Sequence, residues 1–212
     1  TNVNDTIDTT TVHLTSDVTT VAEGGAIIYT ATVANKVTGS DVIVTLADNK
    51  IITIKVGDTT GTLTETVVNN GLAAHADVTN AITTVSGGNY ENLVADTTPI
   101  TTTVTNTPAD THLVLSAPTD VNEGGSIVYT ATVDHAAGTD LTITLSNNQT
   151  ITILAGHTTG TSAPFAVQPN DVYLDATKIS QTVTSVSGGN FDNLVLPTAP
   201  TTTNVNDTID TT

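Results

Sequence analysis

The sequence has no cysteine, no methionine and no tryptophan, and its 212 residues include only four tyrosines and two phenylalanines. Without cysteine the chain forms no disulfide, no thiolate metal site and no thiol nucleophile. Because aromatic side chains are so few, any hydrophobic core must consist of valine, isoleucine, leucine and alanine.

Basic residues are also scarce. Lysine and arginine number 4 against 21 aspartates and glutamates, which gives a formal net charge of −17. A nucleic-acid backbone or an anionic membrane surface would repel such a chain, so neither is expected as a partner. Two interpretations of the acidity stay open, a solvated surface that keeps the protein soluble and a set of cation sites. The second gains weight because the acids gather at predicted junctions and loop ends.

Long hydrophobic runs are missing as well. No apolar run approaches the roughly 18–20 residues of a membrane-spanning helix, and no signal-peptide pattern is present. We therefore expect no direct membrane insertion. If the protein is exported, its export signal is expected outside this sequence.

What the sequence does contain is a repeat. The ten residues TNVNDTIDTT stand at positions 1–10 and return at positions 203–212, and a degenerate copy covers positions 103–110. A fixed period of this kind marks an array of repeated units. At about a hundred residues the period is too long for a solenoid, so each unit is predicted to be a complete domain.

The bodies between these segments match each other too. Residues 23–33 reappear as residues 123–133, and residues 86–94 as residues 187–195. The predicted organisation is a junction segment, a repeat, a second junction, a second repeat and a last junction, at residues 1–10, 11–103, 104–111, 112–203 and 204–212.

The composition indicates an all-β fold. Threonine supplies roughly a quarter of the residues, and β-branched side chains favour the pleated surface of a sheet. Apolar and polar residues alternate in short segments separated by turn signals. In the first repeat these segments predict seven strands, near residues 11–15, 27–33, 41–46, 52–56, 62–68, 79–85 and 101–105.

Seven short strands in about a hundred residues are typical of an immunoglobulin-like β-sandwich, and a barrel remains the alternative. We therefore predict two tandem immunoglobulin-like sandwiches. Helix is expected at most as a single turn, in the loop 69–77 before the sixth strand. Tyr29 and Tyr129 fall on the inward face of their strands and are predicted to fill the core.

Several motifs together resemble a known family. They are NDTID at the last junction, EGGSIVYTATV, TLSNNQTITILAGHTTGT, NDVYLDA and SGGNFDNLV. In this combination the chain resembles the tandem immunoglobulin-like extender repeats of giant RTX adhesins, which are Gram-negative surface proteins of biofilm attachment and ice binding. The resemblance covers nearly all of both repeats.

The resemblance implies an extracellular, structural role. Each repeat is expected to be a spacer on the bacterial cell surface that holds an adhesive domain away from the cell. Calcium is expected to rigidify the junctions. The neighbouring repeats of the same chain are the expected partners, and the chain is expected to be a monomer and not an enzyme.

The acids of the second repeat suggest where calcium binds. The strand order of the predicted sandwich brings the turn after the first strand, the NDVYLD loop and the exit of the last strand to one end, here called the lower end. Calcium takes six to eight oxygen ligands, several of them carboxylates. Five carboxylates meeting at this end would repel each other unless a cation neutralised them, and they are Glu123, Asp171, Asp175, Asp207 and Asp210. The alternative is that these residues only form turns and cap a loop.

The first repeat departs from this pattern. It keeps Glu23, but the other four positions hold Asn70, Ala74, Asn106 and Ala109. The losses fall on both sides of one junction, so we predict that the central junction binds calcium more weakly than an NDTID junction. Other acids remain as substitutes there, namely Asp48, Asp77 and Asp110. At the N-terminus, Asp5 and Asp8 are expected to form an incomplete site.

Catalytic motifs are not found. The five histidines are scattered without the paired spacing of a zinc site, although His112 beside Asp110 remains open as a further ligand. The sequence has no nucleophile elbow, phosphate loop or dinucleotide fingerprint. The alternative to a spacer is a domain that binds glycan or protein through loops 134–140 and 188–193. These loops lie at the end opposite the lower end, here called the upper end. Tyr90 and Phe191 lie in loops at the upper end of the first and the second repeat, where they either stack on sugars or pack.

Overall fold

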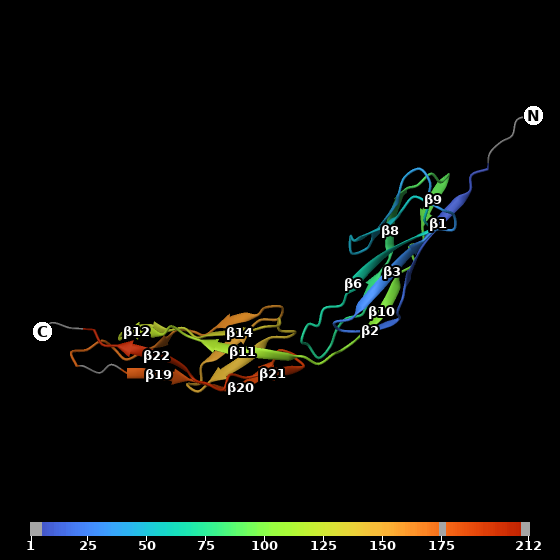
Figure 1. Cartoon of the computed structure of the whole chain (residues 1–212). Helices are drawn as coiled ribbons and strands as arrows, with labels where there is room; N and C mark the ends of the chain where they lie inside the picture. Colours follow the sequence, from blue (N-terminus) through green and yellow to red (C-terminus); the bar gives the residue numbers. More distant parts are fainter. Residues whose placement is uncertain (1–5, 174–176, 209–212) are drawn as a thin grey trace, which may run out of the picture. The chain divides into compact units, whose positions relative to one another are not determined.

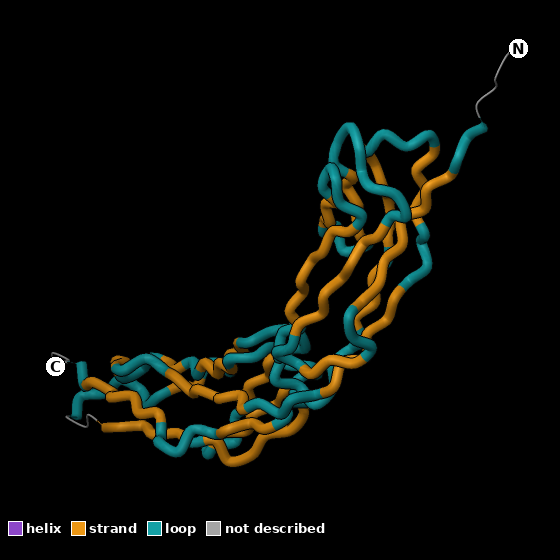
Figure 2. The backbone as a smooth tube through the Cα atoms, turned by 45° about the vertical axis from the view of Figure 1, so that its right-hand side comes forward, coloured by secondary structure: helices purple, strands orange, loops and turns teal. Residues whose placement is uncertain are grey.

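The computed structural model of the chain describes residues 6–173 and 177–208 (Figure 1). The described residues form strands and loops and no helix (Figure 2). The chain folds into two compact units, each a β-sandwich of the immunoglobulin or fibronectin kind. The predicted all-β class with two tandem sandwiches is therefore confirmed.

The first unit consists of Thr1–Asn69 and Ala74–Thr107. Its strands are β1 (Thr9–Ser16), β2 (Thr20–Ala22), β3 (Ala26–Thr32), β4 (Val42–Leu46), β5 (Ile51–Ile54), β6 (Thr60–Thr66), β7 (Val78–Asn80), β8 (Ile82–Gly87), β9 (Asn92–Ala95) and β10 (Ile100–Thr105). They pair in the orders β6-β3-β1-β9, β5-β4-β8 and β2-β10-β7. Buried and exposed residues alternate along β3 and β4, as one face of each strand turns to the core.

Two parallel pairings tie distant parts of the first unit together. Thr9 of β1 pairs with Asn92 of β9, and Thr20 of β2 pairs with Thr103 of β10. Parallel pairing requires a long connection between the two strands. The second of these pairings places the turn after β2 beside the exit of the last strand.

The second unit consists of Asn70–Ala73 and Pro108–Thr212. Its strands are β11 (Asp110–Ser116), β12 (Asp120–Asn122), β13 (Ser126–Ile127), β14 (Thr130–Val133), β15 (Leu141–Leu145), β16 (Thr150–Ile153), β17 (Thr159–Thr161), β18 (Phe165–Ala166), β19 (Thr177–Gln181), β20 (Val183–Gly188), β21 (Asn193–Val195) and β22 (Thr201–Asn206). The sheets are β17-β14-β11-β21, β16-β15-β20, β12-β22-β19 and β13-β18.

A proline accounts for the extra strands of the second unit. In the first unit β3 and β6 pair without a break, whereas Pro164 separates β17 from β18 in the second unit. Proline has no N–H to give to a sheet. Across the break the N–H of Tyr129 donates instead to the Ser162 hydroxyl, at 3.0 Å. The ladder is interrupted, but this backbone donor keeps a partner.

Each unit has its own aliphatic core around one tyrosine. Tyr29 and Tyr129 are both fully buried, as the alternation predicted. The side chains packed with them are valine, isoleucine, leucine and alanine from both layers of the sandwich. Tyr90 and Phe191 pack against the cores as half-buried residues.

The loop 69–77, where at most one helical turn is expected, contains no helix. The Asn70 side chain accepts a hydrogen bond from the N–H of Leu72 at 2.8 Å, which forms a local turn that competes with helix. Gly71 has a φ of 67°, outside the helical region. Leu72 makes an isolated antiparallel bridge to Phe191. The loop is therefore part of a pairing with distant residues.

Candidate metal centre

Glu123 lies in the turn between β12 and β13, at the lower end of the second unit. The parallel pairing of β12 with β22 brings this turn beside the end of the last strand. The N–H of Glu123 donates to the carbonyl of Asn206 at 3.0 Å, and the N–H of Gly124 donates to the carbonyl of Gln168 at 2.7 Å. The turn, the exit of β22 and the loop after β18 thus meet, as the topology predicted.

The Glu123 carboxylate is buried, with only 5% of the residue exposed. Its Oε1 accepts hydrogen bonds from the N–H and the hydroxyl of Thr208, both at 2.9 Å. Its Oε2 is buried and has no hydrogen-bond partner among the described residues. The backbone hydrogen bond from Thr208 holds the pKa of Glu123 below its usual range despite the opposing effect of burial. A buried anion with one unpaired oxygen is costly unless a cation lies nearby.

A second carboxylate lies near that of Glu123. The Asp207 side chain and the N–H of Asp171 are near enough to the Glu123 carboxylate to contribute to its lowered pKa. The Asp171 side chain accepts a hydrogen bond from the N–H of Tyr173 at 2.8 Å, which shapes the loop after β18. Calcium prefers carboxylate oxygens, and this donor set fits it in kind.

The predicted five-acid set is not complete in the described part of the chain. Asp175 and Asp210 lie outside the described residues, as does Asp5. Among residues 6–173 and 177–208, no three acidic or histidine side chains come together closely enough to hold a metal ion. The calcium ligands therefore stay a prediction, with Glu123 and Asp207 as the two carboxylates that the structure brings together.

The first unit keeps the same glutamate without the other acids. Glu23 is 4% exposed, and its Oε2 accepts a hydrogen bond from the N–H of Thr107 at 3.1 Å. Its Oε1 is buried and has no hydrogen-bond partner within the described residues. Asn69 donates to the carbonyl of Thr107 at 2.7 Å, where the second unit has a loop with Asp171. The glutamate thus fixes this turn in both repeats, and the additional acids belong to the second.

The remaining predicted acids have separate partners. Asp110 accepts from the Asn193 side chain at 2.6 Å. Asp77 accepts from the N–H of Val104 at 3.2 Å, and Asp48 forms an ion pair with Lys50 at 3.1 Å. The N–H of Asp8 donates to the carboxylate of Glu91 at 2.5 Å. These contacts are ordinary turn and loop contacts.

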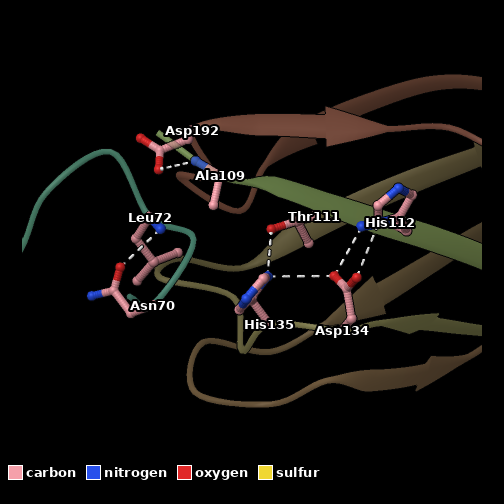
Figure 3. Close-up of polar contacts among 8 residues, drawn as sticks. All are labelled: Asn70, Leu72, Ala109, Thr111, His112, Asp134, His135 and Asp192. Atoms are coloured by element: carbon pink, nitrogen blue, oxygen red, sulfur yellow. Dashed lines mark hydrogen bonds and ion pairs between the residues drawn. The ribbon is translucent and has the colours of Figure 1, made fainter. Parts of the chain in front are cut away.

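The upper end of the second unit holds a polar cluster that sequence reasoning missed (Figure 3). Asp134 accepts hydrogen bonds from the N–H of His112 at 2.8 Å and lies 3.1 Å from its Nδ1. The Nδ1 of His135 lies 3.4 Å from Asp134 and 3.0 Å from the Thr111 hydroxyl. Burial would raise the pKa of Asp134, but the hydrogen bonds from His112 outweigh it and the pKa is lowered. His112 therefore contacts Asp134. The only signal of this contact in the sequence is that Asp134 directly follows the strand that neighbours the strand of His112 in the predicted sandwich.

The same upper loops are engaged by residues of this chain. Residues 70–73 lie against them in the second unit, and Leu72 pairs with Phe191. Asp192 accepts a hydrogen bond from the N–H of Ala109 at 3.1 Å. The surface considered for glycan or protein binding is therefore partly covered from within the unit.

Comparison with known families gives one result for both repeats. A family model described as the LapA domain matches residues 8–107 and again residues 109–208. A solved structure described as "Structures of Clostridium thermocellum CbhA fibronectin(III)-like modules" is similar at 13% identity, over 92% of this chain and 94% of that one, with a TM-score of 0.24. Comparison with curated proteins gives no match.

The described residues include no helix long and apolar enough to cross a membrane. The LapA domain is a repeat of adhesins, which are cell-surface proteins and not a kind of enzyme. The two matches together cover nearly the whole chain. The chain therefore belongs to the LapA domain family and consists of two successive LapA domains.

Proposed function

We propose that this chain is an extender of an RTX-type biofilm adhesin, a monomeric extracellular spacer stiffened by calcium at the lower end of the second unit. The role requires no catalysis. It draws support from the two similar repeats and from the large excess of acidic residues. The observation that carries it is the Glu123 carboxylate, which is buried, ionised and left with one unpaired oxygen, and which has the Asp207 side chain near it.

Glu123 and Asp207 would hold the calcium, together with Asp171, Asp175 and Asp210 from the sequence prediction. When bound, calcium supplies the positive charge that this group of acids lacks. The residues come from the turn after β12, the loop after β18 and the segment after β22. Joining these three parts removes freedom at the point where the chain leaves the unit.

The proposal is tested by calorimetric titration of calcium into the chelator-treated chain. We expect at least one tight site in the wild type. Glu123→Gln removes the unpaired anionic oxygen and should weaken that site at least tenfold. Glu23→Gln makes the same change in the same turn of the first repeat, which lacks the other acids, and should leave the tight site unchanged.

Two results would contradict the proposal. One is the absence of calcium binding by the wild type, and the other is an equal loss of affinity in both variants. A fold check by circular dichroism in chelator separates lost binding from lost structure. A ligand that binds only the folded state raises its free energy of unfolding, by about 2.7 kcal/mol at a ligand concentration of a hundred times Kd. Thermal unfolding with and without calcium therefore gives a second measurement of binding.

A further inference from the structure

Four residues belong to one repeat by sequence and to the other unit by their contacts. Residues 70–73 lie between β6 and β7, within the first LapA match, 8–107. Their contacts place them in the second unit. The chain therefore enters the second unit after Asn69, leaves it after Ala73 and enters it again after Thr107.

The segment is held by backbone hydrogen bonds around a single antiparallel bridge. Leu72 pairs with Phe191 in the loop after β20. The N–H of Asp192 donates to the carbonyl of Gly71 at 3.0 Å, and the N–H of Ala73 donates to the carbonyl of Asn190 at 3.1 Å. This is the pattern of a short added strand, in which main-chain bonds supply the attachment.

The receiving surface has a space shaped for Leu72. A Cβ atom added to Gly138 would lie 3.1 and 3.3 Å from the two terminal carbons of Leu72. Such distances are closer than ordinary van der Waals contact. Glycine at position 138 therefore leaves the room that the leucine side chain occupies.

Glycine is required in the segment itself. Gly71 is buried, has a φ of 67°, and a Cβ added to it would lie 2.7 Å from two ring atoms of His135 and 2.9 Å from the Thr111 hydroxyl. The His135 ring is fixed by Thr111 and Asp134 (Figure 3). A side chain at position 71 would meet both a backbone strain and a steric clash.

The matching loop of the second repeat is different at this position. Asp171 and Tyr173 form the same local turn as Asn70 and Leu72, each with a hydrogen bond of 2.8 Å. Between them stands Val172, which is 60% exposed and has no positive φ. The loop that retains the acids thus has valine, and the loop that lost them has glycine.

We propose that residues 70–73 are a docking segment that fastens the first repeat to the second without a cation. Its receptor is the upper end of the second unit, formed by the loop 188–192 with Gly138 and His135. The segment holds no acid, and its attachment depends on backbone bonds, the fit of Leu72 and the absence of a side chain at position 71. This inference is independent of calcium binding at Glu123.

The test is amide hydrogen exchange, measured by NMR on the whole chain in calcium and in chelator. We expect the amides of Ala73 and Asp192 to be protected equally in both conditions. Gly71→Val, which places the residue of the second repeat at this position, should speed exchange at both amides at least tenfold. The amide of Ile143 in the core should keep its protection.

Two further variants keep the test decisive. Gly57→Val imposes a comparable backbone strain, at a φ of 94°, but a Cβ there has no neighbour within 4 Å, so it should leave Ala73 and Asp192 protected. Gly138→Ala fills the space for Leu72 from the receptor side and should speed their exchange. Fast exchange at these amides in the wild type, protection that is lost in chelator, or unchanged protection in Gly71→Val and Gly138→Ala would overturn the proposal.

Discussion

Asp96, just after β9, shows how a single carboxylate is stabilised on the surface of the first unit. It accepts hydrogen bonds from the hydroxyl of Thr98 at 2.6 Å and from its N–H at 3.1 Å, and it lies 2.9 Å from Nδ1 of His13. These contacts, that of the Thr98 hydroxyl above all, lower the pKa of Asp96 to about 2. The unfolded value is about 3.9. The contacts therefore stabilise the unit fully above about pH 4, and the stabilisation is lost as the pH falls toward 2.

Replacing Thr98 with alanine should raise the pKa of Asp96. The variant loses the hydroxyl donor, which is the largest cause of the shift, while the backbone donor and His13 remain. The measurement is an NMR titration of the Asp96 carboxyl carbon. Thr97→Ala changes an exposed neighbour and serves as the control. A pKa that stays near 2 in Thr98→Ala would show that the hydroxyl is not the main donor.

At the scale of the strands, the hydrogen bond that satisfies the Tyr129 N–H at the Pro164 break can be tested by changing Ser162. The Ser162 hydroxyl accepts the N–H of Tyr129, and both residues are buried. Ser162→Ala leaves this donor unpaired, which costs roughly 1–3 kcal/mol. Urea unfolding of the second unit should show a loss of that size. Ser116→Ala, where the hydroxyl bonds Thr130 at an exposed site, should cost less than about 0.5 kcal/mol, and equal losses would contradict the explanation.

The strands that sequence reasoning found and missed differ in what specifies them. Strands such as β3 and β4 alternate along their own sequence, so the local pattern was sufficient. The strands β2 and β9 are three and four residues long and pair in parallel with segments more than eighty residues away. Their positions depend on those partners and leave little local signal. The loop 69–77 gave no sign of its pairing for the same reason, because Leu72 pairs with the distant Phe191.

The candidate site could be predicted in outline at the scale of the whole domain. The strand order of a sandwich was sufficient to bring the turn of Glu123 together with the segment that carries Asp207. The burial of Glu123 and its unpaired oxygen could not be read from the sequence, because they depend on hydrogen bonds from Thr208, 85 positions away. The docking segment was missed because the need for Gly71 becomes visible only beside His135 and Thr111.

At the scale of the whole chain, two kinds of attachment are proposed, the docking segment 70–73 and the calcium site at the acids of the second repeat. They should respond differently to calcium. The central connection uses the docking segment and has lost four of the five acids, so chelator should not change the flexibility between the two units. A chain made of two copies of this sequence, joined so that residues 203–212 of one copy serve as residues 1–10 of the next, adds a connection with the acids of the second repeat. Chelator should make that longer chain more flexible.

Small-angle X-ray scattering checks this difference through the maximum dimension and the spread of fitted conformations. The present chain should give the same values with calcium and with chelator, whereas the longer chain should broaden in chelator. Gly71→Val should broaden the present chain in both conditions, since it releases the docking segment whatever the calcium level. A chelator effect of equal size in both chains would mean that one mechanism serves both connections. The difference between the loop with Gly71 and the loop with the acids would then have no effect on flexibility.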